Sequence, residues 1–170
     1  MSTDLQTLGD RVAAALATNP NAMTMQLARD LGVPEAHVLR GLPAGRAVEL
    51  DVARWEELIR SFEAFGAVHV IVSNGAVTLE SKGQFGNFST WGEFFNVQTK
   101  LDMHIRWGRL AAAFAVEKPG HLDGVPTLSV QFFDADGHSA FKVFLTFGGK
   151  PPTPERRAQF EAVRDRFRRS

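Results

Sequence analysis

The chain has 170 residues, 44% of them hydrophobic, and its formal net charge is zero. This length and composition are typical of a globular chain that buries a core of its own. The absence of cysteine excludes disulfides, thiolate metal sites and cysteine nucleophiles. A balanced charge gives no general attraction to nucleic acid or to an acidic membrane, so we expect neither as a partner.

No stretch of the sequence approaches the ~18 consecutive apolar residues that a bilayer span requires. The first residues also lack a basic segment followed by an apolar one, as an export signal would have. We therefore expect a cytoplasmic protein.

The first 45 residues predict a cap of short helices. Apolar residues recur at helical spacing over 4–18. Thr24 is the expected N-cap of a helix through Asp30, and Pro34 suits the first position of the next helix. The turn at Gly32 between these two helices gives a helix-turn-helix pattern.

A DNA-reading helix needs polar and basic side chains. The second helix of the pattern offers Glu35, His37 and Arg40, whose charge is balanced. We therefore interpret the pattern as a structural cap and keep a DNA-binding regulator as an alternative.

A third helix is predicted from Asp51, its expected cap, to Phe65. The period then changes to two over 67–73 and 76–82, on either side of Asn74-Gly75, a strong hairpin signal. A two-residue loop would place His69 opposite Glu80. We expect one face of this hairpin to be core: Val68, Val70, Val72, Val77 and Leu79. The other face, which holds His69, Ile71, Ser73 and Thr78, is mixed and suited to lining a site.

The rest of the chain predicts more strands and one helix. Residues 83–95 read as a glycine-broken aromatic loop, and strands are expected over 100–107 and 110–116. A second hairpin is expected from 127–133 and 139–147, and a last helix starts after Thr153 as N-cap. The order predicts an α+β fold, with a large antiparallel sheet, N-terminal helices and a C-terminal helix. Residues 1–45 would form the helical cap and 46–170 the sheet domain of one compact unit.

The aromatic segment could wall a flat ligand, because glycine lets backbone approach closely and aromatic rings supply an apolar surface. A heme requires an apolar slot, one axial donor and cations for its two propionates. The expected pocket residues are Phe85, Phe88, Trp91, Phe95 and Met103, and the available cations are Lys100, Arg106, Arg109 and Lys142. The alternatives are an ordinary aromatic core and surface ion pairs.

With neither tyrosine nor cysteine in the chain, histidine and methionine remain as ordinary axial donors. Of five histidines, His104 lies on the polar side of its strand between Asp102 and Arg106. An exposed sheet face explains that position equally well. No pair of histidines has zinc-site spacing. Asp134 and Asp136 fall in a tight turn, where aspartate is favoured for turn geometry.

Several segments resemble the ChuX/HutX family of heme-utilisation proteins. The similar segments are Val38–Pro43, Val77–Trp107 with Leu101-Asp102-Met103-His104-Ile105, and the hairpin from Leu128 to Leu145. Together they span about residues 24 to 147, and their order is more specific than any one of them. The pattern also resembles one half of the larger HemS/ChuS proteins.

The resemblance implies a large antiparallel sheet, heme as cofactor, a homodimer that imitates the two-half proteins, and a heme-degrading acceptor protein. It places His104 on the family's heme-linked histidine, so that His104 would bind the heme iron, and Lys142 on a frequent family lysine. Some members carry a second heme-linked histidine where this chain has Ser73. His69 is four residues away, about 13 Å along a strand, and is not a simple substitute.

We therefore expect a heme carrier or storage protein rather than an enzyme, with His69 and Ser73 as possible second heme contacts. A heme-degrading or iron-releasing enzyme is the first alternative. A DNA-binding regulator and a structural dimer module are the others.

Overall fold

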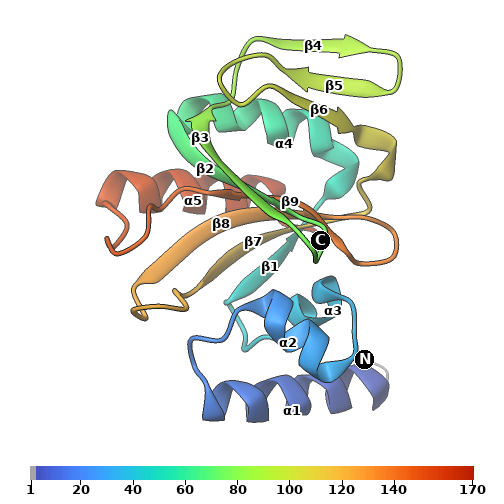
Figure 1. The fold of residues 1–170 in the computed structure, drawn as a ribbon, viewed down its shortest axis with the longest axis vertical. Helices are drawn as coiled ribbons and strands as arrows, with labels where there is room; N and C mark the ends of the chain where they lie inside the picture. The colour runs from blue at the N-terminus through green and yellow to red at the C-terminus, as the bar shows by residue number, and fades with distance from the viewer. Residues whose placement is uncertain (1–2) are drawn as a thin grey trace.

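The computed structural model describes residues 3–170, with side chains from Thr7 onward. Helices α1 (Thr3–Thr18), α2 (Thr24–Leu31) and α3 (Glu35–Arg40) form the predicted N-terminal cap (Figure 1). The cap has a small core of its own: Leu8, Val12, Ala22, Leu27, Ala28 and Val38. For α2 and α3, the N-cap residue differs by one position from the prediction. Met23 and Pro34 precede the helices, and Thr24 instead turns its hydroxyl toward the buried Glu35.

A six-stranded antiparallel sheet fills the middle of the molecule (Figure 1), in the order β1-β7-β8-β9-β2-β3. Its strands are β1 (Ala47–Leu50), β2 (Ala67–Ser73), β3 (Thr78–Gln84), β7 (Ala112–Pro119), β8 (Pro126–Phe133) and β9 (Ser139–Phe144). The β8–β9 hairpin was predicted correctly. Strand β1 was missed, because four residues are too short to show alternation and only pairing with β7 holds them extended.

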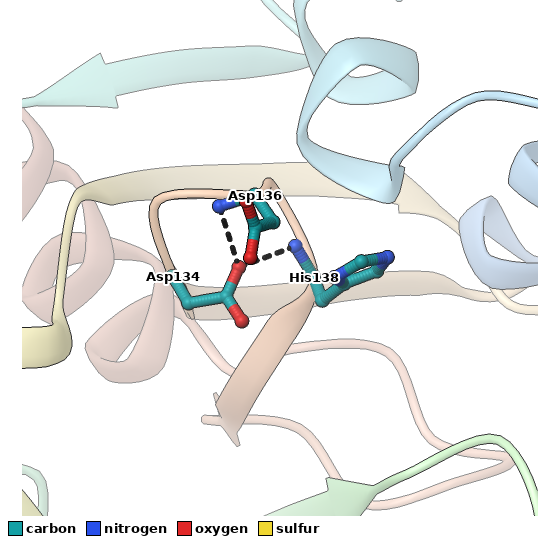
Figure 2. Close-up of side chains that lie close together, drawn as sticks. All are labelled: Asp134, Asp136 and His138. Atoms are coloured by element: carbon teal, nitrogen blue, oxygen red, sulfur yellow. Dashed lines mark hydrogen bonds between the residues drawn. The ribbon is translucent and has the colours of Figure 1, made fainter.

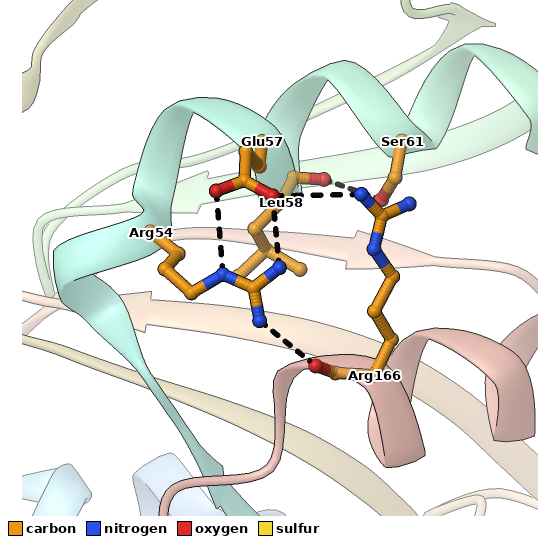
Figure 3. Close-up of polar contacts among 5 residues, drawn as sticks. All are labelled: Arg54, Glu57, Leu58, Ser61 and Arg166. Atoms are coloured by element: carbon orange, nitrogen blue, oxygen red, sulfur yellow. Dashed lines mark hydrogen bonds and ion pairs between the residues drawn. The ribbon is translucent and has the colours of Figure 1, made fainter.

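Helices α4 (Trp55–Ser61) and α5 (Pro154–Phe167) cover one face of this sheet. The predicted helix over 51–65 is α-helical only in α4, with 3-10 turns at its two ends, Val52–Arg54 and Phe62–Phe65. Asp51 caps the first of these turns, as expected. Thr153 caps α5, also as predicted. Figure 3 shows how the two helices are joined: Arg54 bonds Glu57 and the carbonyl of Arg166, and Arg166 also reaches Glu57.

A second, three-stranded sheet lies beyond α4, at the top of Figure 1, and consists of β4 (Phe88–Trp91), β5 (Phe94–Val97) and β6 (Met103–Arg106). The aromatic segment 83–95 is therefore not the predicted loop. It contains a hairpin that turns at Gly92, whose φ of 57° favours glycine. The prediction failed because bulky rings on both sides of the strands hide the alternation.

The register of the β2–β3 hairpin differs from the prediction. Oδ1 of Asn74 accepts hydrogen bonds from the backbone N–H groups of Ala76 and Val77. The loop therefore spans residues 74–77, and Ser73 pairs with Thr78. His69 consequently lies opposite Lys82 and not opposite Glu80. Val68 and Val70 are core as predicted, but Val72, Val77 and Leu79 are exposed where the hairpin extends past the helices.

The cap packs on the other face of the large sheet. Ala36 and Leu39 of α3 form a buried cluster with Ala112, Phe114 and Phe133. This cluster lies over β7 and β8, with Ala47 of β1 packed against it. No helix in the described part of the chain has the length and apolarity to cross a membrane. The division at residue 45 stays a prediction, since the cap has its own core but also shares this cluster.

Candidate functional site

The outer face of the three-stranded sheet carries His104. Pairing of β5 with β4 and β6 aligns Ser89, Asn96 and His104 in one row across the sheet. The next row on the same face is Trp91, Phe94 and Arg106. We call these six residues the His104 face. The His104 side chain is 62% exposed and Trp91 is 78% exposed, so both are open to a ligand.

A hydrogen bond orients the His104 imidazole. Nδ1 lies 2.7 Å from Oδ1 of Asn96, whose Nδ2 donates to Ser89 Oγ at 3.2 Å. Because Oδ1 is only an acceptor, this contact favours the tautomer that is protonated on Nδ1 and has its lone pair on Nε2. Asn96 is 6% exposed, so this bond is sheltered from water. Metal-binding histidines usually donate their second ring nitrogen in this way.

The cation on this face is already paired. Arg106 bonds Glu93 at 2.6 Å and lies over the Phe94 ring. That bond lowers the pKa of Glu93 and raises the pKa of Arg106. Both groups are exposed, so the pair is easily exchanged for another anion.

The other predicted pocket residues do not lie on the His104 face. Phe95, Phe88 and Met103 point inward toward α4, where Phe95 meets Trp55 edge-to-face at 5.3 Å. Phe85 is 2% exposed and packs edge-to-face on Phe62. These rings support the small sheet from beneath, as the core interpretation expected. Trp91 is the predicted pocket ring that the sheet leaves exposed.

A cavity of about 790 Å³ opens on the face of the large sheet that the cap leaves uncovered. We call it the Lys118 cavity. It contains the mixed face of the β2–β3 hairpin, including His69 and Ser73, as the alternation predicted. His69 Nε2 lies 3.0 Å from Glu80, and Ser73 Oγ accepts from Thr78. Apolar side chains supply much of the remaining wall: Met23, Met25, Ile71, Leu122, Phe144 and Phe147.

Lys142 also lines this cavity, where it forms a largely buried ion pair with Glu35 of α3 at 2.5 Å. The pair joins cap and sheet. Lys118 lies nearby and donates to the Pro119 carbonyl. Burial, together with Lys142 and Arg46, lowers the pKa of Lys118 to about 8, although Glu35 opposes the shift.

Lys100 lies neither on the His104 face nor in the Lys118 cavity. It lines a hollow of about 430 Å³ with Ala67, Lys82 and Thr99. Arg106, Lys142 and Lys100 therefore do not meet in one site of a single chain. Arg109, the fourth expected cation, lies near the Arg106–Glu93 pair, where its charge helps to lower the pKa of Glu93. Asn96 and Lys118 were not among the site residues expected from the sequence. A lone amide within the apolar string Phe94-Phe95-Asn96-Val97 was the signal for Asn96, but its meaning depends on the β5–β6 register.

Asp134, Asp136 and His138 come together in the β8–β9 turn, as Figure 2 shows. Asp134 Oδ1 accepts hydrogen bonds from the backbone N–H groups of Asp136 and His138, and a ring nitrogen of His138 lies within 4.8 Å of a carboxylate oxygen of each aspartate. This is the turn geometry expected from the sequence.

The helix-turn-helix pattern leaves few side chains available to contact DNA. On α3, Glu35 is 5% exposed, and Arg40 bonds Glu49 and lies over the Phe114 ring. Glu35 and Arg40 are thus engaged within the protein, whereas His37 is exposed.

Comparison with known proteins agrees with this fold. Residues 48–163 match the family described as "Haem utilisation ChuX/HutX". The intracellular heme transport protein HutX of Vibrio cholerae is 24% identical over 168 residues, which cover 96% of this chain and 86% of HutX.

Two solved structures share the architecture. The heme-binding protein ChuX has a TM-score of 0.79 at 20% identity, over 91% of this chain and 97% of ChuX. The heme-degrading enzyme ChuS of Escherichia coli O157:H7 has a TM-score of 0.80 at 19% identity, over 97% of this chain and 47% of ChuS. The family match covers more than half of the sequence, and the chain belongs to the ChuX/HutX family.

Proposed function

We propose that this protein is a cytoplasmic heme carrier that binds the heme iron through Nε2 of His104. One observation carries the proposal: Asn96 binds Nδ1 of an exposed imidazole, which leaves the Nε2 lone pair for a metal, with the Asp102 carboxylate 4.0 Å from Nε2. Trp91 and Phe94 on the same face supply apolar surface for a porphyrin ring.

The relatives support this choice of ligand. HutX is named as a heme transport protein and ChuX as a heme-binding protein. In the described part of the chain no other histidine has an exposed ring with a buried amide behind it.

A second copy of the chain would complete the site. The His104 face is flat and covers only one side of a porphyrin, whereas a tightly held ligand is usually enclosed on most of its surface. This chain spans about half of ChuS. We therefore propose a homodimer in which the partner covers the other side of the heme, and a heme-degrading protein as acceptor.

Ligation by one histidine follows from the positions of the other candidates. His69 and Ser73 lie in the Lys118 cavity and not on the His104 face, and His69 is held by Glu80. Within one chain they would be contacts for the periphery of a ligand, not second axial donors. Of the candidate cations, Arg106 lies on the same face as His104, and Arg109 is close enough to act on Glu93, the partner of Arg106.

A hemin titration tests the proposal. We expect wild-type protein to shift the Soret band on binding, and His104→Ala to lose most of that shift and at least about tenfold in affinity. His138→Ala is the matched control, since His138 is exposed in the β8–β9 turn and is not part of the three-stranded sheet that carries His104. A His104→Ala protein with the wild-type spectrum and affinity would reject the assignment.

Turnover of the heme distinguishes a heme-degrading enzyme from a carrier. A carrier that receives hemin and a reductant should keep its Soret band, because it binds the ring without turning it over. A heme-degrading enzyme would bleach the band and release a linear or iron-free product, measurable by absorbance and chromatography.

A further inference from the structure

The turn that precedes β6 places a carboxylate beside the free nitrogen of His104. Oδ1 of Asp102 lies 4.0 Å from Nε2, whereas Nδ1 on the other side of the ring is bound to Asn96. In the tautomer that Asn96 favours, Nε2 and the carboxylate are both acceptors. A positive charge next to Nε2 would be stabilised by both of them, so the position suits a cation.

The same turn holds Asp102 in place. The backbone N–H of Asp102 donates to the Thr99 carbonyl, and Thr99 Oγ1 donates to the Gln84 carbonyl of β3 at 2.6 Å. Leu101 is 7% exposed and packs so closely on Gly83 that a Cβ at this glycine would lie 2.8 Å from the leucine Cγ. The turn is therefore tied to β3 at two points, and the short aspartate side chain has little freedom to leave His104.

Asp102 also has an unusual backbone conformation. Its φ is +31°, a left-handed value that residues with a side chain adopt rarely. Such values persist where the surrounding contacts fix them, and they gather at ligand sites and active sites. Glycine would adopt this φ more easily but would carry no charge. An aspartate at such a position, beside a candidate metal ligand, indicates that its carboxylate has a use.

A negative charge at this position acts differently on the two oxidation states of a heme. The ring and iron together carry one positive charge when the iron is ferric and none when it is ferrous, and a carboxylate is negative at neutral pH. The Asp102 side chain is 74% exposed, so water screens it in the free protein. A porphyrin that lies on the His104 face displaces part of this water and strengthens the attraction.

We propose that Asp102 makes the His104 site selective for ferric heme. The carboxylate stabilises the ferric iron more than the ferrous iron, and it thereby lowers the reduction potential of the bound heme. Asp102 acts through its charge and is not itself a ligand of the iron. The inference rests on the proposed ligation by His104 and deepens it, because it names the oxidation state in which the heme is held.

Asp102→Asn removes the charge, keeps the size of the side chain and tolerates the left-handed backbone. The midpoint potential of hemin-loaded wild type and variant is measured by spectroelectrochemical titration at low ionic strength. We expect the variant to lose about fivefold in ferric relative to ferrous affinity, which raises the potential by about 40 mV at about 59 mV per tenfold change. A loss of structure alone would weaken both oxidation states equally and leave the potential unchanged.

Three further proteins make the test specific. Asp136→Asn is the matched control, because it removes an exposed carboxylate of the β8–β9 turn, outside the three-stranded sheet, and should keep the wild-type potential. Asp102→Glu keeps the charge and should retain most of the effect. Asp102→Gly removes the charge and suits the left-handed φ, so it replaces Asp102→Asn should the asparagine variant fail to fold. Added salt should shrink the difference between wild type and Asp102→Asn.

Two results would overturn the inference. Equal potentials in Asp102→Asn and Asp136→Asn would mean that the iron does not sense the carboxylate. A lower potential in Asp102→Asn would mean that the carboxylate hinders the ferric iron. Both are distinct from a failure of the proposed function. If the Soret shift still depends on His104 and the potential does not move, only the role of Asp102 is rejected, whereas a wild-type protein that leaves hemin optically unchanged rejects both.

Discussion

The His104 face and the Lys118 cavity each supply half of what a heme requires. The His104 face has an oriented donor nitrogen but no enclosing walls. The Lys118 cavity has apolar walls and a spare cation, but its histidine, His69, is bonded to Glu80. The difference suggests that ligation and enclosure are separate tasks in this fold, which a second copy of the chain would bring together.

The two regions also differ in what supports them. The His104 face rests on α4 through aromatic contacts, whereas the Lys118 cavity is bounded by the large sheet and the cap. Substitutions beneath one region should therefore leave the other intact.

The largest effect is expected for Phe95→Ala. Phe95 is fully buried and meets Trp55 edge-to-face and Phe88 in a stack at 5.4 Å. Its loss should lower the free energy of unfolding by about 3–5 kcal/mol, since it leaves a hole between α4 and the small sheet. Denaturant unfolding measures this. Thr90→Ala, opposite Phe95 in the sheet but exposed, should change stability by less than about 0.5 kcal/mol. Similar values for the two variants would contradict this account.

Lys142→Met should cost about 3 kcal/mol, because it leaves the 5% exposed carboxylate of Glu35 without its cation. The double variant Glu35→Gln, Lys142→Met removes both charges and should recover much of the loss. Thermal or denaturant unfolding measures both proteins. Hemin binding through His104 should not change in either one. A single variant as stable as wild type would mean that the pair is not needed between cap and sheet.

Asn96→Leu should keep the fold and weaken hemin binding by about 10- to 100-fold, because His104 loses the acceptor that fixes its ring and its tautomer. Asn96→Asp keeps an acceptor and should restore binding, with a shifted Soret position. Ser89→Ala removes only the hydroxyl that accepts from Nδ2 of Asn96, so it should have a smaller effect on hemin binding. If leucine and aspartate behave alike, Asn96 does not position the imidazole.

Local sequence signals predicted much of the fold. Asp51 and Thr153 capped their helices as expected, and the alternation over 127–133 gave β8. Register was not predictable from the turn dipeptide, since the Asn74 side chain holds a longer loop. Strand β1 was invisible because its stability comes from pairing with a distant strand.

The candidate site was predictable only in part. Alternation placed His104 on an exposed face, and the family resemblance gave it a role. Pattern could not distinguish Trp91, which faces water, from Phe95, which faces the core, because both stand in one aromatic run. Lys118 was missed because its meaning depends on neighbours far away in sequence, Lys142, Arg46 and Glu35.

The smallest effect concerns the pH dependence of stability in the Lys118 cavity. The pKa of Lys118 is lowered to about 8 by burial and by the charges of Lys142 and Arg46, against the attraction of Glu35. The unfolded chain keeps this proton up to about pH 10.5. Between these values the unfolded state binds more protons, so wild-type stability should rise with pH relative to Lys118→Met.

Because Lys118 keeps part of its surface in water, we expect the rise to be on the order of 1 kcal/mol. Unfolding of wild type and Lys118→Met at several pH values from 7.5 to 10.5 measures it, as a difference that cancels the other titrating groups, including His69, Glu80, His121, Asp123 and Lys150 around the cavity. A flat slope would mean that the Lys118 ammonium is as well solvated in the folded protein as in the unfolded chain.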